Sequence, residues 1–138
     1  MKQLGRNESS QLAVFIKSVT KGRRGSWLSV GLGSYFGESR QVRSSNVLAA
    51  AAEALLREEP LSELLVFPEP DVEASNIAAE ASKIVAAELV GYCERSQVGC
   101  INYYILPARL PPAWCMVMCH ENDVHLLGAA AKWKMKRT

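Results

Sequence analysis

The chain has 138 residues, of which 49% are hydrophobic and 22% are charged, and these values fit one globular domain with its own core. No apolar run reaches the roughly 18 residues of a membrane helix, and the opening stretch MKQLGRNESS lacks the apolar segment of a secretory signal. We therefore expect a soluble intracellular protein with no membrane partner. We interpret its four cysteines (Cys93, Cys100, Cys115 and Cys119) as free, buried thiols in preference to metal ligands.

The net charge is only +2, but basic residues are concentrated at both ends of the chain. Residues 1–44 carry eight Lys or Arg and two Glu, residues 45–99 carry three basic and ten acidic residues, and residues 100–138 carry five basic and two acidic residues. This pattern indicates a dipolar molecule that presents a positive face to phosphate, although an ordinary solvated surface is an alternative explanation.

The N-terminal part of the sequence is typical of an antiparallel hairpin. In SQLAVFIKS, Leu12, Val14 and Ile16 alternate with other residues, which predicts a strand. The loop VTKGRRGS separates it from WLSVGLGSYFG, which alternates in the same way and predicts a second strand. We expect a further short extended piece near ESRQVR.

The middle of the sequence predicts a helix, a buried strand and a second, longer helix. Ser44 or Ser45 is the expected N-cap of a helix over about 48–56, whose alanines favour close packing. SELLVF predicts a short strand that is buried on both faces. Asp71 is the expected N-cap of an amphipathic helix from about 72 to 94.

The C-terminal part predicts two strands and a final helix. CINYYIL and WCMVMC are the strands, PARLPP connects them, and NDVHLLGAAAKWKMK is the expected helix. Strands followed by alternating helices and strands predict one α/β domain over residues 1–138. We expect a mixed sheet with an antiparallel N-terminal hairpin and flanking helices.

The order of these elements resembles that of the ribonuclease H family over nearly the whole chain. VFIKS looks like the first strand of that family, and KGRRGSWLSVGLG looks like its hairpin. SSNVLAAAAEALL is similar to the opening of its first helix, and LLVFPEPDVEASNIA to its fourth strand and the turn that follows. WCMVMCHENDVHLLGAAAKW resembles its late strand and C-terminal helix.

Active members of that family use several carboxylates to hold two divalent cations. In the resemblance, the carboxylate positions fall at Lys17, near Ala50, at Pro68 or Glu69, and near Ala130, whereas the mobile histidine matches His120. A lysine at the centre of such a site repels cations. The resemblance therefore implies a catalytically inactive module that binds nucleic acid, RNA in preference to DNA, or serves as an assembly subunit.

The basic ends of the chain supply the candidate phosphate contacts. These residues are Lys21, Arg23 and Arg24 in the first loop, and Lys132, Lys134, Lys136 and Arg137 near the C-terminus. Trp27, Tyr35 and Trp133 are candidates for stacking on bases, although large aromatic residues beside apolar ones more often belong to a core.

Three alternatives remain open from the sequence. The first is a ribonuclease that depends on Mg²⁺ or Mn²⁺ and uses Glu53, Glu69, Asp71 and Asp123, with His120 assisting proton transfer. The second is an RNA- or DNA-binding protein of the Alba family, which the segments from residue 26 onward also resemble. This resemblance implies that CINYYIL and WCMVMC form a hairpin, whereas an antiparallel N-terminal hairpin continuous with the main sheet would favour ribonuclease H. The third is a role in protein interaction, including homo-oligomer formation. Motifs for phosphate loops, dinucleotide binding and nucleophile turns are absent, so we expect no cofactor outside the nuclease alternative.

Overall fold

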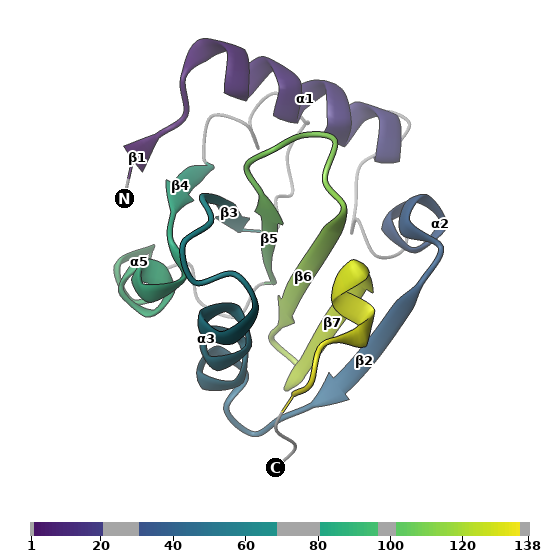
Figure 1. Cartoon of the computed structure of the whole chain (residues 1–138), viewed down its shortest axis with the longest axis vertical. Coiled ribbons are helices and arrows are strands. Elements are labelled where there is room, and N and C mark those ends of the chain that lie inside the picture. Colours follow the sequence, from purple (N-terminus) through teal and green to yellow (C-terminus); the bar gives the residue numbers. More distant parts are fainter. Residues whose placement is uncertain (1, 21–30, 69–80, 97–101, 136–138) are drawn as a thin grey trace.

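The computed structural model describes residues 2–20, 31–68, 81–96 and 102–135 (Figure 1). Its elements, in chain order, are β1 (Lys2–Gln3), α1 (Arg6–Thr20), α2 (Gly33–Phe36), β2 (Ser39–Arg43), α3 (Val47–Glu58), β3 (Leu64–Pro68), β4 (Ser82–Ile84), the 3₁₀ helix η2 (Ala86–Glu88), α5 (Leu89–Ser96), β5 (Tyr103–Pro107), β6 (Trp114–Cys119), β7 (Asp123–Gly128) and the 3₁₀ helix η3 (Ala129–Lys132). The expectation of an α/β fold is confirmed.

The strands form one seven-stranded sheet in the order β1-β4-β3-β5-β6-β7-β2. Every pairing among the described strands is antiparallel, so the expected mixed sheet is wrong for this part of the chain. The short strands β1 and β2 form the two edges. Because β2 pairs with β7, residues 39–43 lie next to a strand that is 80 or more positions later in the sequence.

Both faces of the sheet carry a hydrophobic core. On one face, α3, α5 and η3 pack on strand residues such as Val66 and Met116, and on the other face α1 packs on Phe67 and Tyr104. All five residues of β3 are buried, because alternate side chains enter the two cores. This confirms the strand predicted to be buried on both faces.

The segment that we expected to form the first strand is helix α1. Its buried residues Leu12, Phe15, Ile16 and Val19 follow helical spacing, whereas Val14 is 68% exposed. Glu8 supports the start of the helix, because its Oε1 accepts a hydrogen bond from the backbone N–H of Gly5 at 2.9 Å. The predicted hairpin is therefore not formed by residues 6–20. Residues 31–36 of the predicted second strand are also helical, and residues 27–30 lie outside the described part.

Helix α3 and strand β2 agree with the sequence expectations, with one change at the helix cap. The cap is Asn46, whose Oδ1 accepts the N–H of Ala49 at 3.1 Å, and not Ser44 or Ser45. Ser44 instead supports the cap, since its Oγ accepts the N–H of Asn46 at 3.2 Å. Four of the five alanines of α3 (Ala50, Ala51, Ala52 and Ala54) are buried against the sheet, as expected, because their small side chains allow a close approach, whereas Ala49 is exposed.

The expected continuous helix from 72 to 94 is interrupted by a strand, and its prediction is confirmed as α-helix only for residues 89–94. Residues 82–84 form β4, which pairs with β1 on one side and β3 on the other, and α5 begins only at Leu89. The pairing with two strands outweighs the helical pattern of this stretch. Asp71 and the rest of 69–80 lie outside the described residues.

The expected C-terminal helix is also wrong, because residues 123–128 form strand β7. A three-residue turn, 120–122, connects β6 to β7, and Asn122 adopts a left-handed φ of 66° in it. Gly128 ends β7 at a φ of 66°, a conformation that glycine adopts without strain. The strands predicted from CINYYIL and WCMVMC are confirmed as β5 and β6.

Candidate nucleic-acid interface

Two of the seven predicted phosphate contacts lie within the described residues. Lys132 ends η3, Lys134 follows two residues later, and both are exposed. The other five (Lys21, Arg23, Arg24, Lys136 and Arg137) lie outside the described part, and so does the predicted stacking residue Trp27.

Two arginines that the sequence analysis did not select hold the segment around Lys134. Arg40 of β2 donates a hydrogen bond from Nη2 to the carbonyl oxygen of Trp133, and Arg57 of α3 donates one from Nη2 to the carbonyl oxygen of Lys134. The partners are 93 and 77 positions apart in the chain, so no local sequence pattern signals them. The fold thereby brings four cations, Arg40, Arg57, Lys132 and Lys134, to one side of the molecule; we call them the basic C-terminal face.

The apolar residues of the same segment fix its position. The ring of Trp133 lies against that of Trp114, with 4.8 Å between the ring centroids, and Met135 packs on the same core. Trp133 is therefore partly a core residue, and only its remaining surface is open to a ligand. Lys134, between these two anchors, projects from a backbone that is already ordered, so a ligand need not order it on binding.

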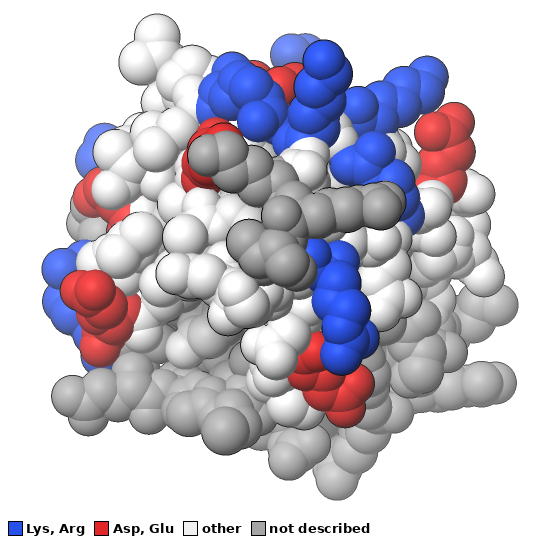
Figure 2. Space-filling view, turned by 90° about the horizontal axis from the view of Figure 1, so that it is seen from below, with Lys and Arg blue, Asp and Glu red and all other residues white. Residues whose placement is uncertain are grey.

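The charges of this face are only partly compensated. A backbone carbonyl is neutral, so the hydrogen bonds of Arg40 and Arg57 leave both guanidinium charges in place. Glu58 offsets part of one of them, since its Oε2 lies 3.0 Å from the Nε of Arg57. Figure 2 views the end of the molecule that is at the bottom of Figure 1 and shows Lys and Arg side chains gathered over its upper part, with fewer acidic side chains between them.

The carboxylates predicted for a nuclease site are not brought together within the described residues. Glu53 is exposed on α3, Asp123 is buried on β7, and Glu69 and Asp71 lie outside the described part. Lys17, expected on the first strand at the centre of the site, is instead exposed on helix α1. Among the described residues, neither Glu53 nor His120 belongs to a group of three potential ligands within metal-binding reach.

His120 lies just beyond strand β6, whose last residue is Cys119. It lies in the turn after the strand, and its ring Nδ1 is 3.0 Å from Oδ1 of the buried Asn102, which also accepts the backbone N–H of His120 at 3.2 Å. Glu121 lies 3.9 Å from its Nε2. These contacts are local and hold the turn next to β5.

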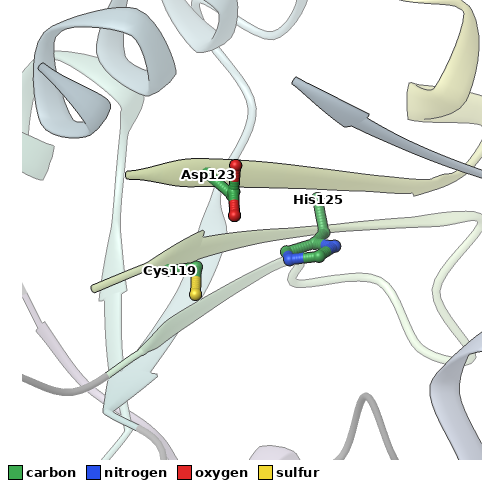
Figure 3. A group of neighbouring side chains, drawn as sticks. All are labelled: Cys119, Asp123 and His125. Atoms are coloured by element: carbon green, nitrogen blue, oxygen red, sulfur yellow. The ribbon is translucent and has the colours of Figure 1, made fainter. Parts of the chain in front are cut away.

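Asp123 lies instead with two residues that the sequence analysis did not select as ligands, Cys119 and His125. One ligand atom from each of the three lies within 4.8 Å of the others (Figure 3). We expected a helix here, and the five-residue spacing of His120 and His125 does not fit a zinc motif on one face of a helix. In a hairpin, however, the facing positions of β6 and β7 bring all three residues to one face of the sheet.

Comparison with protein-family models, with curated proteins and with solved structures finds no match to the chain. Among the described residues, no helix has both the length and the apolar character that a membrane crossing requires.

Proposed function

We propose that the protein binds the phosphate backbone of nucleic acid through its basic C-terminal face. The observation that carries the proposal is the pair of hydrogen bonds from Arg40 and Arg57 to the carbonyls of residues 133 and 134. These bonds place two fixed guanidinium groups beside Lys132 and Lys134. Side chains of this kind contact phosphates regardless of sequence, so the expected activity is binding without sequence preference.

The arrangement favours contact with phosphate in two ways. Arg57 is exposed, so its bond to a carbonyl leaves other N–H donors of the guanidinium for an anion. Arg40 is half-buried and its Nε is enclosed, so within the described structure only its Nη groups can face a ligand. The two lysines are exposed and extend the row of charge along the C-terminal segment. We take RNA as the first ligand to test, because both families that the sequence resembles act on or bind RNA.

The finer assignments stay predictions. A ribonuclease H-like or an Alba-like origin each implies nucleic acid, but the binding proposal depends on neither. The hairpin that was expected to favour ribonuclease H over Alba is replaced by helix α1 in residues 6–20. Strands β5 and β6 form the hairpin that the Alba-like alternative expected. A role as an assembly subunit, or as a homo-oligomer, also remains a prediction.

The experiment compares two variants with the same kind of charge loss. The double variant Lys132→Gln/Lys134→Gln removes two cations of the basic C-terminal face, and Lys17→Gln removes one exposed cation of α1, which packs on the opposite face of the sheet. Binding of a fluorescent single-stranded RNA of about 20 nucleotides is followed by anisotropy, with single-stranded DNA of the same sequence beside it.

We expect the double variant to bind about 25-fold more weakly at 0.1 M salt. Two lost phosphate contacts reduce the slope of log K against log salt concentration by about 1.4, and this is a factor of about 25 between 1 M and 0.1 M salt. Lys17→Gln should bind like the wild type. If the double variant binds as tightly as the wild type, or if Lys17→Gln weakens binding as much, the basic C-terminal face is not the interface.

A further inference from the structure

We propose that Cys119, Asp123 and His125 form a binding site for Zn²⁺ or a divalent transition-metal ion with similar ligand preferences. The site is separate from the basic C-terminal face, and the proposal does not depend on nucleic-acid binding. It rests on the register of two strands, on the chemistry of three different donors and on the burial of the carboxylate.

The strand register fixes the three positions. Cys119, the last residue of β6, pairs directly with Asp123, the first residue of β7, across the short turn. His125 lies two residues further along β7 and therefore on the same face as Asp123. Strand β7 is hydrogen-bonded to β6 on one side and to β2 on the other, so the backbone of this site is held by the sheet.

The distances are close to those of a metal centre. The ligand atoms lie within 4.8 Å of one another, whereas donors around tetrahedral zinc are about 3.4 to 3.6 Å apart when the bonds have their usual lengths of roughly 2.0 to 2.3 Å. The remaining difference, at most about 1.2 to 1.4 Å, is within the reach of side-chain rotation, with the backbone unchanged. Figure 3 shows Cys119 on one strand and Asp123 and His125 on its neighbour.

The donor set selects the class of ion. A thiolate is a soft ligand that magnesium and calcium do not take, whereas sulfur, imidazole nitrogen and carboxylate oxygen together are typical of zinc. Burial lowers the pKa of His125, and the neutral imidazole is the form that binds a metal. One thiolate and one carboxylate balance the charge of a divalent cation. Three protein donors leave a fourth tetrahedral position for water or another ligand.

The charge around Asp123 is consistent with a cation at this place. The residue is only 5% exposed, and within the described structure its carboxylate has one charged neighbour, Arg43, with Nη1 at 3.6 Å from Oδ1. That distance is longer than a hydrogen bond, and the arginine side chain is 76% exposed. A buried carboxylate with so loose a partner gains from a cation bound directly to it. Arg43 can turn into solvent when the ion binds.

Cobalt and zinc titrations of the metal-free, reduced 138-residue protein test the proposal. We expect one equivalent of Co²⁺ to give the absorption of a thiolate-bound, four-coordinate ion, and one equivalent of Zn²⁺ to displace it. Cys119→Ser should remove the thiolate band. Cys119→Ser and His125→Gln should each weaken zinc binding by more than the roughly 10- to 100-fold that is usual for loss of an outer-shell partner.

Matched controls separate this site from the other thiols and imidazoles. Cys93→Ser, Cys100→Ser and His120→Gln should keep the band and the affinity of the wild type. Arg43→Gln should bind zinc at least as tightly as the wild type, since it removes a competing positive charge, and a purely structural role of the three residues does not predict this result.

Two measurements keep the proposal open to refutation if a ligand variant does not fold. Native mass spectrometry of the wild type should show one zinc per chain, and X-ray absorption at the zinc edge should show one sulfur among nitrogen and oxygen neighbours. No bound zinc at one equivalent, a zinc shell without sulfur, or a thiolate band that survives in Cys119→Ser overturns the proposal.

Discussion

Gly128 ends strand β7 at a point where the structure leaves no room for a side chain. Its φ is +66°, and a Cβ at this position would lie 2.5 Å from the carbonyl oxygen of Ala113 and 2.7 Å from a ring carbon of Phe36. The left-handed backbone costs a non-glycine residue about 1 to 2 kcal/mol, and overpacking against a backbone atom adds about 1 to 3 kcal/mol. We therefore expect Gly128→Ala to lower the free energy of unfolding by about 2 to 5 kcal/mol.

Two other glycines separate the contributions. Gly37 also has a positive φ, +75°, but a Cβ there meets nothing within 4 Å, so Gly37→Ala should cost only about 1 to 2 kcal/mol. Gly33 has open space and an ordinary φ at the start of helix α2, so Gly33→Ala should leave stability unchanged or raise it by up to about 1 kcal/mol. Urea unfolding followed by tryptophan fluorescence measures all three. If Gly128→Ala costs no more than Gly37→Ala, the close approach of the β7 end to Ala113 is not as described.

Three further predictions concern a helix cap, an ion pair and a thiol. Asn46→Ala should destabilise the protein by about 1 kcal/mol in the same urea assay, because the N–H of Ala49 loses its acceptor, whereas Asn46→Asp should change little. The hydrogen bond from Lys83 to Glu8 (2.8 Å) lowers the pKa of Glu8 and raises that of Lys83, so the stability from this pair should be lost as the pH falls below the ordinary Glu value of 4.5 or rises above the ordinary Lys value of 10.5. Glu8→Gln should then match the wild type in acid and be less stable at pH values between these limits, and an equal difference at all pH values would contradict the assignment. Burial raises the pKa of Cys115 far above its usual range, so iodoacetamide should label this thiol only after unfolding, as peptide mass mapping can show; rapid labelling of the folded protein would mean that the site is open.

Strong local patterns predicted several elements correctly. The alanine-rich run of α3 and the apolar strands β3 and β6 carry their signal in consecutive residues. The strand prediction for SQLAVFIKS was wrong because the segment fits two periodicities: Leu12 and Ile16 match both a strand and a helix. Phe15 and Val19 distinguish the two, because they are buried with Leu12 and Ile16 and the four side chains form one apolar stripe at helical spacing.

The errors in the second half of the chain have a different cause. Residues 82–84 and 123–128 become strands through pairing with partners distant in sequence, which propensity does not record. In β7, Val124 and Leu126 face one core and Leu127 faces the other, so the segment has no clean alternation. A strand buried on both faces and a helix give similar short apolar runs.

The candidate sites were predictable only in part. Lys132 and Lys134 were found from the charge pattern, whereas Arg40 and Arg57 join them through tertiary contacts. The proximity of Cys119, Asp123 and His125 was not predicted, because the segment after the turn was expected to form a helix. Once the hairpin is known, the spacing of the three residues places them on one face.

The salt dependence of RNA binding tests the central claim most directly. Four phosphate contacts from the basic C-terminal face predict that the logarithm of the binding constant falls with the logarithm of salt concentration with a slope of about −2.8 for a single strand. Between roughly 50 and 200 mM salt, the wild type should lose affinity by about 50-fold, and the Lys132→Gln/Lys134→Gln variant by only about sevenfold. A wild-type affinity that changes by less than about threefold over this range, or a slope that the double variant shares, would contradict the account.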